Sequence, residues 1–248
     1  MPRVVALRLA VAAAACALLV RGDLMVKQHS TPKSLLSKVP VFLLTNEGGQ
    51  PYLTQGKDGD QLGQMFLFLR DAQNALEVLK NMPGASDARM WKTDLHRAMR
   101  MAQRNAKSGL VNSEGREMRM LMRLHPHDRQ RTNARVVFLR QGQLFRKPPE
   151  VPVFYAEGLV AEKRCGAVVP LFFAKEELDR VWSRMALRSG GAMPPAPKVT
   201  VTSLGEVLQT VDKDPSVRVD FYVNDNTLDW IKAQRPAGKA RIFRPRRF

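Results

Sequence analysis

Few residues in this sequence stand at the spacings that metal binding requires. The nearest approach is His125-Pro126-His127, which Asp128 follows directly. A zinc site takes about four ligands, drawn from cysteine, histidine and carboxylate side chains at characteristic spacings. Because no cysteine or spaced carboxylate set accompanies the two histidines, we interpret the segment as a solvated loop. We therefore expect no metal and no cofactor.

The paired carboxylates also fit structural roles. Asp58 and Asp60 lie among glycines, which is typical of a hairpin tip. Glu176 and Glu177 lie at the start of an expected helix, where acidic side chains interact favourably with the helix dipole. The sequence contains neither a G-x-S-x-G nucleophile elbow nor a G-x-x-x-x-G-K-[ST] phosphate loop. We therefore predict that the protein is not an enzyme, with no catalytic residue and no small-molecule substrate.

The elements that must carry these residues begin with a motif that occurs twice. Val39-Pro40-Val41-Phe42 returns as Val151-Pro152-Val153-Phe154. Each copy is followed by a turn-prone stretch and a second apolar strand, which contains residues 65–68 in the first copy and 170–173 in the second. Such internal repetition predicts two similar halves in place of one asymmetric catalytic cleft.

Periodicity predicts the elements of the first half. Strands are expected over residues 38–45 and 64–69, and a helix over 71–81. The later expected elements of this half are a helix over 87–107, a short methionine-rich helix over 117–124, a loop over 126–133 and a strand over 134–139.

The second half repeats the pattern. The expected elements are a strand over 151–155, a hairpin over 157–166, strands over 168–173, 199–202 and 217–223, and helices over 175–187 and 228–233. Ser203 and Glu206 stand at the spacing of a capping box, which predicts another helix start at this point.

These elements predict an α+β fold with two pseudo-repeated halves. Each half is expected to be a small, mostly antiparallel sheet with helices on one face. The expected divisions are a targeting segment or anchor with its lead-in at 1–37, a first half with a basic insertion at 38–147, a second half at 148–231 and a basic extended tail at 232–248.

The net charge of +17 is concentrated in two segments. Residues 87–147 contain 15 Lys and Arg against 5 Asp and Glu, and residues 232–248 contain 7 against none. Surfaces of this kind attract an acidic partner, which leaves RNA, an anionic membrane and acidic protein as alternatives. The expected docking residues share a basic side chain in one of these segments: Arg97, Arg100, Arg104, Arg241, Arg244, Arg246 and Arg247.

The N-terminus resembles a targeting segment. Residues 1–22 contain no acid, and an uninterrupted apolar run covers residues 9–20 between Arg8 and Arg21. The run has the length of a signal-peptide core, an organellar presequence fits its arginine-rich composition equally well, and a retained membrane anchor is the alternative. Cys16 lies in this run and Cys165 in a later turn, so we expect no disulfide.

The repeated strand and the elements after it resemble the Tic-twenty-two family, named for a small component of the chloroplast inner-envelope protein translocon. The second half is the closer match: its first strand, Pro170-Leu171-Phe172-Phe173 and Lys175-Glu176-Glu177-Leu178 stand in the order and spacing of the family. In the first half, residues 39–45 and 66–79 match more loosely. The resemblance covers about residues 38–223, and it implies a two-lobed α+β fold without catalysis.

The resemblance also implies a function. Plastid members act as chaperone-like import factors in the intermembrane space, so we expect an organellar, protein-binding protein that uses apolar grooves between its halves. The basic segment and tail suggest an alternative, in which the chain is a structural accessory subunit of a respiratory, photosynthetic or ribosomal complex. The compartment is expected to be a plastid or a mitochondrion, in the intermembrane space or at a membrane.

Overall fold

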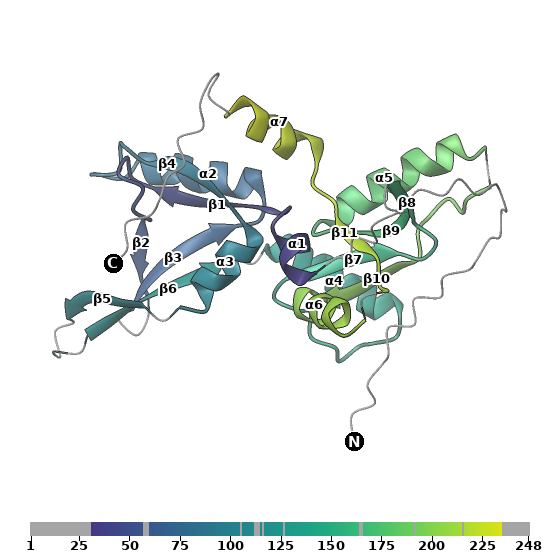
Figure 1. The fold of residues 1–248 in the computed structure, drawn as a ribbon, viewed down its shortest axis with the longest axis horizontal. Coiled ribbons are helices and arrows are strands. Elements are labelled where there is room, and N and C mark those ends of the chain that lie inside the picture. The colour runs from purple at the N-terminus through teal and green to yellow at the C-terminus, as the bar shows by residue number, and fades with distance from the viewer. Residues whose placement is uncertain are drawn as a thin grey trace, which may run out of the picture.

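Two groups of β-strands lie side by side in the computed structural model, and a short helix lies between them (Figure 1). The structure describes residues 31–234 apart from 57–59, 105, 112–114, 116, 126, 164–165, 191 and 215, and for 106–110 it describes the backbone. Residues 1–30 of the expected targeting segment with its lead-in, and residues 235–248 of the expected tail, lie outside the described residues.

The first sheet has the strand order β4-β1-β3-β6-β5, with β2 paired to the side of β3. Its strands are β1 (Pro40–Thr45), β2 (Leu53–Gln55), β3 (Gln61–Phe66), β4 (Arg89–Asp94), β5 (Ala106–Val111) and β6 (Glu117–Leu124). The β3–β6 pair is parallel, and the other pairs described in this sheet are antiparallel.

The second group of strands pairs in the corresponding order. Its members are β7 (Pro152–Ala156), β8 (Ala161–Lys163), β9 (Gly166–Leu171), β10 (Val199–Ser203) and β11 (Val219–Phe221). β10 pairs antiparallel with β7 as a two-stranded sheet, and β9 pairs parallel with β11 in a three-stranded sheet that includes β8. A bridge between Phe154 and Phe172 joins β7 to the end of β9, and we call the strands joined in this way the second sheet. The Phe154–Phe172 bridge corresponds to the Phe42–Phe66 pair that joins β1 to β3.

Helices cover both faces of each sheet. They are α1 (Pro32–Leu36), α2 (Leu69–Lys80), α3 (Leu95–Ala102), α4 (Asp128–Arg140), α5 (Lys175–Arg188), α6 (Leu204–Lys213) and α7 (Asp225–Ala233). The expected α+β class and the mostly antiparallel pairing are confirmed. The expectation of one covered face is corrected, because the apolar residues of the strands do not alternate with polar ones. In β1, Phe42 faces α2, while Val41 and Leu43 pack with α3 on the opposite face.

Residues 87–107 form β4, α3 and β5 in place of the expected helix. The helical spacing of Leu95, Ala98 and Met99 is real, but it describes only α3. Before it, residues 89–94 pair with β1 along its whole length. The Asp94 side chain accepts a hydrogen bond from the backbone N–H of Arg97, which fixes the start of the helix at this point.

The two elements that follow also differ from expectation. Residues 117–124 form the strand β6, in which Met118, Met120 and Met122 stand at every second position, the period of a strand. The loop expected at 126–133 and the strand expected at 134–139 are together helix α4. Ala134, Val137 and Phe138 are its buried apolar residues, and their spacing places them on one helical face.

Helices α4 and α7 each cover the sheet of the other half. α4 follows the first sheet in the chain, yet its buried residues pack with Phe154 and Phe172 of the second. α7 follows the second sheet, and its Trp230 packs edge-on against Phe42 of the first, with 5.3 Å between the ring centroids. Each half therefore contributes one helix to the apolar core of the other, and we call α4 and α7 the exchanged helices. The expected boundary between the halves at residue 147 stays a prediction.

The lead-in to the first strand is a packed element. Thr31 and Ser34 form a capping box that starts α1, and Pro32 occupies the first helical turn, where its missing N–H has no cost. Leu35 and Leu36 are 0% and 5% exposed, and α1 contacts α3 of the first half and α6 of the second. The lead-in expected from the sequence therefore contains a short helix whose leucines are buried between the halves, and we call this helix the α1 wedge.

Leu35→Ala should destabilise the protein strongly, although the residue lies in a five-residue helix. Removal of a fully buried leucine side chain costs roughly 2–5 kcal/mol in the free energy of unfolding. Leu187→Ala is the matched control, because this leucine is 84% exposed on α5, and its change should stay within about 0.5 kcal/mol. Chemical denaturation measures both values. Equal effects of the two variants would show that α1 is not part of the cooperative fold.

Candidate functional site

A groove lies where the two halves meet. The first half lines it with Val39, Pro40, Leu67 and Phe68. The second half lines it with Phe172, Phe173, Ala174, Glu177, Tyr222, Val223, Asn224 and Thr227. We call this site the junction groove. Its walls come from the end of β3 and the start of α2 on one side, and from the corresponding β9–α5 connection and the β11–α7 connection on the other.

Three aromatic contacts hold the apolar walls of the junction groove in place. Phe68 meets the ring of His127 edge-on at 4.6 Å between centroids. Phe173 stacks on Phe221 at 4.8 Å, and Tyr222 packs against Phe172 at 5.0 Å. Phe68 and Tyr222 keep part of their surface exposed. The groove therefore offers a pre-formed, partly exposed aromatic surface of the kind that binds apolar side chains.

Two polar side chains of the junction groove, Glu177 and Asn224, have partners inside the protein. Glu177 accepts two hydrogen bonds from Nη1 of Arg180, at 2.9 and 2.8 Å. The Asn224 side chain accepts a hydrogen bond from the backbone N–H of Thr227 at 2.8 Å and caps α7. Both side chains therefore stabilise local structure, one within α5 and one at the start of α7.

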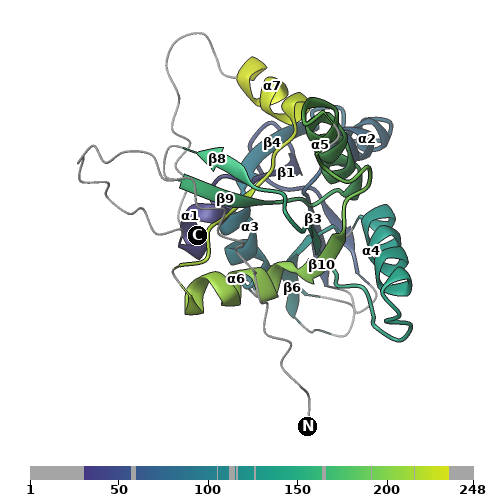
Figure 2. The ribbon, with the colours of Figure 1, turned by 90° about the vertical axis from the view of Figure 1, so that its right-hand side faces the viewer.

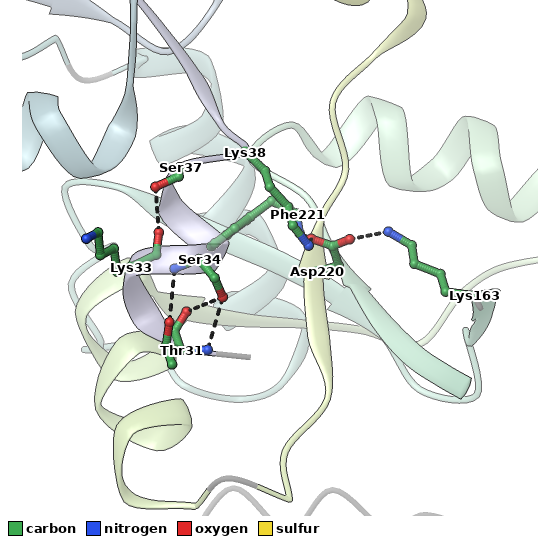
Figure 3. A network of polar contacts seen from close by, with 8 residues as sticks. All are labelled: Thr31, Lys33, Ser34, Ser37, Lys38, Lys163, Asp220 and Phe221. Carbon is green, nitrogen blue, oxygen red and sulfur yellow. Dashed lines mark hydrogen bonds and ion pairs between the residues drawn. The ribbon is translucent and has the colours of Figure 1, made fainter. Parts of the chain in front are cut away.

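An ionic clasp fastens the strands beside the junction groove. Asp220 of β11 is 7% exposed. It lies between two lysines, as Figure 3 shows, with Lys38 Nζ 3.3 Å away on one side and Lys163 of β8 on the other. Lys38 directly precedes Val39, and Asp220 lies two residues before Tyr222, so the clasp joins two walls of the groove. The buried carboxylate is thus neutralised by cations from both halves.

A second polar cluster joins α4 to α5, the helix that lines the junction groove. The carboxylate of Glu176 accepts hydrogen bonds from Gln130 Nε2 at 2.7 Å and Asn133 Nδ2 at 3.0 Å, and Arg129 Nε lies 2.7 Å away. Burial raises the pKa of Glu176, but these hydrogen bonds and the nearby guanidinium outweigh burial and hold the pKa below its usual value. We call this cluster the Glu176 clamp.

A smaller apolar cavity of about 20 Å³ lies under α6 on the other face of the second sheet. It is lined mainly by valines and leucine, with Tyr155, Thr202 and Thr210 at its edge. Burial raises the pKa of the Tyr155 hydroxyl. In the part of the chain that the structure describes, no group of three or more His, Cys, Asp or Glu is placed to hold a metal ion.

The histidines and aspartate singled out from the sequence have other neighbours. His125 packs against the ring of Phe66 at 5.2 Å. His127 contacts Phe68 and lies 3.7 Å from Asp71. Asp60 directly precedes β3 and accepts a hydrogen bond from Arg119 Nη2 at 2.9 Å, whereas Asp58 lies outside the described residues. These side chains support the packing of the first sheet.

The expected basic docking residues are only partly brought together. Arg97 and Arg100 project from α3 as exposed side chains, and Arg104 lies beyond the end of that helix. Arg97 is also engaged with Asp94, with 3.3 Å between Nε and Oδ2. Arg241, Arg244, Arg246 and Arg247 lie outside the described residues. The structure therefore places two of the seven expected docking residues together on one helix.

Comparison with known proteins identifies the family of this chain. A model of the Tic22-like family matches residues 14–221. This chain belongs to the Tic22-like family. The match includes both sheets and the groove residues from Val39 to Glu177, so it confirms the resemblance seen in the repeated strands and the helix after them.

Solved Tic22 structures have a similar fold. Tic22 from Plasmodium falciparum is 22% identical, with a TM-score of 0.60, and the match covers 82% of this chain and 96% of that chain. Tic22 from Anabaena, a protein-transport protein, is 18% identical with the same TM-score, and the match covers 82% and 95% of the two chains. No curated protein matches the sequence.

The residues that line the groove of this Tic22-like chain were not identified from the sequence. Phe68 and Phe173 read as ends of apolar strands, and Tyr222 as part of an alternating strand. The feature of the sequence that could have identified them is their position, because both phenylalanines stand between a strand and the helix that follows it. Within the described residues, no helix combines the length and apolar character needed to cross a membrane.

Glu176→Gln should weaken the Tic22-like fold in a pH-dependent way. Because folding lowers the pKa of Glu176 from 4.5, its ionised form stabilises the protein above pH 4.5, and this contribution is lost as the pH falls through the lower folded-state value. The variant should lose about 1 kcal/mol of stability at neutral pH. Its difference from the unmodified protein should shrink below pH 4.5.

Urea denaturation across this pH range measures the effect. Glu162→Gln is the control, because Glu162 is exposed on β8. If Glu176→Gln and Glu162→Gln gave the same pH profile, the Glu176 clamp would have no energetic role.

Proposed function

We propose that this Tic22-like protein binds other proteins through the junction groove, in a protein-import or chaperone-type role. The observation that carries the proposal is the pre-formed aromatic and aliphatic lining of the groove, supplied by both halves. Family membership supports it, as does the fold shared with an Anabaena protein of protein transport. We also propose that the chain is not an enzyme, since Glu177 and Asn224 of the groove are engaged in structural contacts.

The size of the site favours a polypeptide over a small molecule. The cavity in the groove has a volume of about 50 Å³, whereas an engineered cavity that binds benzene has roughly 150 Å³. A site of this size accepts one apolar side chain at a time. An extended or unfolded segment presents such side chains one after another. Because contact through apolar surface is non-directional, the affinity should depend little on the order of residues in the bound segment.

Replacement of groove residues should weaken the capture of unfolded protein. Phe68→Ser combined with Val223→Ser removes apolar surface from both walls of the groove. We expect that about five to ten times more of this variant is needed to suppress aggregation of a chemically denatured client, because central apolar contacts dominate such interfaces. Light scattering of the client during dilution from denaturant measures the effect.

Trp91→Ser combined with Val78→Ser is the matched control, because these side chains are 39% and 59% exposed and lie outside the groove lining. The melting temperatures of both double variants establish that they remain folded. The proposal is wrong if the two variants suppress aggregation equally well.

A second candidate function rests on the exposed arginines. Arg97 and Arg100 on α3, with Arg104 just beyond it, give the first half a basic surface that is separate from the junction groove. This favours the role of a structural accessory subunit that docks through the basic segment and the tail on an acidic protein surface. Such a subunit co-purifies in fixed stoichiometry with one complex, while an import factor or chaperone is recovered mostly free.

Charge reversal tests this second candidate. Arg97→Glu, Arg100→Glu and Arg104→Glu, together with truncation after Gln234, should remove an accessory subunit from its complex on native gels. The same changes should leave client capture by the junction groove unaltered. Native-gel mobility of organelle extracts, with mass spectrometry of the bands, distinguishes the two roles. Unchanged membership of every large complex would exclude docking through these residues.

We propose an organellar location for either role, in a plastid or a mitochondrion. The arginine-rich, acid-poor segment at 1–22 supports it. Family membership favours a plastid-type compartment, in the intermembrane space or at a membrane.

A further inference from the structure

The end of α4 and the turn after it carry apolar side chains that the fold leaves uncovered. Phe145 is 96% exposed and Leu144 is 65% exposed. Val136 and Leu139, on the outer side of α4, are 38% and 45% exposed. We call these four residues the α4 tip. Figure 2 shows α4 at the right-hand edge of the ribbon, beside β10 of the second sheet.

The surroundings of the α4 tip are basic. Residues 129–149 contain six Lys and Arg and no Asp or Glu. Arg135 and Arg140 are exposed on α4, and Lys147 is exposed in the segment after it. Arg146 lies over the ring of Phe138 at 4.6 Å from its centroid, and the nearest carboxylate that it reaches is Glu206 at 3.9 Å. A protruding apolar cluster is thus surrounded by cations.

The backbone under the α4 tip is held firmly. The N–H of Gln143 donates to the carbonyl of Phe138 at 2.8 Å, and Gly142 adopts a φ of 73°, which closes the turn after the helix. Gln141 Nε2 donates to the carbonyl of Val199 at 2.9 Å, which ties the turn to β10. Phe138 beneath it is 1% exposed. The exposure of Leu144 and Phe145 is therefore built into the fold.

We propose that the α4 tip docks this protein on the surface of a membrane that contains anionic lipid. Aromatic and aliphatic side chains flanked by Lys and Arg bind in this way, because the apolar groups enter the boundary of the bilayer while the cations meet the lipid headgroups. The tip protrudes and does not line the junction groove or the cavity under α6. A bilayer accepts a protruding apolar group at any position, whereas a protein partner needs a matching pocket.

This docking leaves the junction groove free. The groove and the α4 tip share no residue, since the groove is formed by the β3–α2, β9–α5 and β11–α7 connections. A protein held by the α4 tip can therefore bind a polypeptide while it stays at a membrane surface. The failure of either proposal does not imply the failure of the other.

The test uses the full chain with vesicles of phosphatidylcholine alone and of phosphatidylcholine mixed with phosphatidylglycerol. The apolar leader and the basic tail also have the composition of lipid-binding segments, so the readout must be local. Hydrogen–deuterium exchange of peptides covering 139–147 provides it. We expect slower exchange there with phosphatidylglycerol vesicles only, and no change at 184–190, where Leu187 is 84% exposed on α5.

Two sets of variants separate the apolar and the electrostatic parts of the binding. Leu144→Ser with Phe145→Ser should weaken co-sedimentation with the mixed vesicles about tenfold, while Leu187→Ser should not. Arg140→Glu with Lys147→Glu should weaken it by at least about fivefold for each cation. All these side chains are exposed, so circular dichroism should show folded variants.

Unchanged exchange at 139–147 in the presence of mixed vesicles would overturn the proposal, as would equal co-sedimentation of the Phe145 and Leu187 variants. A photoreactive phenylalanine at position 145 that crosslinks to protein and not to lipid in native membranes would likewise overturn it and assign the α4 tip to a protein interface.

Discussion

Each sheet of this protein depends on a helix supplied by the other half. The phenylalanine pairs Phe42–Phe66 and Phe154–Phe172 join equivalent strands and are nearly fully buried. The first pair is covered by α2 and by Trp230 of α7. The second pair is covered by α5 and α4. Because burial of such aromatic surface is the main source of stability, separation of the halves would expose both cores.

The position of the junction groove follows from this exchange. The β3–α2 and β9–α5 connections face one another where the halves meet, and the chain crosses back beside them from β11 to α7. The α1 wedge and the clasp around Asp220 close the same junction from other sides. The groove can therefore keep its aromatic walls in register only while the halves form one body. A rigid apolar surface of this kind binds a partner at a lower entropic cost than a loose one.

The parts of the fold that the sequence predicts best are those with a strong local signal. The duplicated Val-Pro-Val-Phe strand, the α5 helix and the Ser203 capping box all carry such a signal, and the structure has each of them. The predictions of a helix at residues 89–94 and a strand at 134–139 are wrong, because pairing with β1 and packing on the second sheet decide the structure of these segments. The junction groove depends on contacts between segments about 100 residues or more apart. Periodicity within one segment cannot reveal such contacts.

Native-state hydrogen exchange of the two central strand pairs tests most directly whether the halves are one cooperative body. The measured amides are those of β1 and β3 in the first sheet and those of Phe154 and Phe172, which bond each other's carbonyls, in the second. If the exchanged helices unite the halves, the amides of both sheets should exchange through the same unfolding reaction. The free energies of opening measured for the two sets should then agree within about 1 kcal/mol and depend on denaturant in the same way. Opening of one sheet at clearly lower free energy, while the other stays protected, would contradict the account.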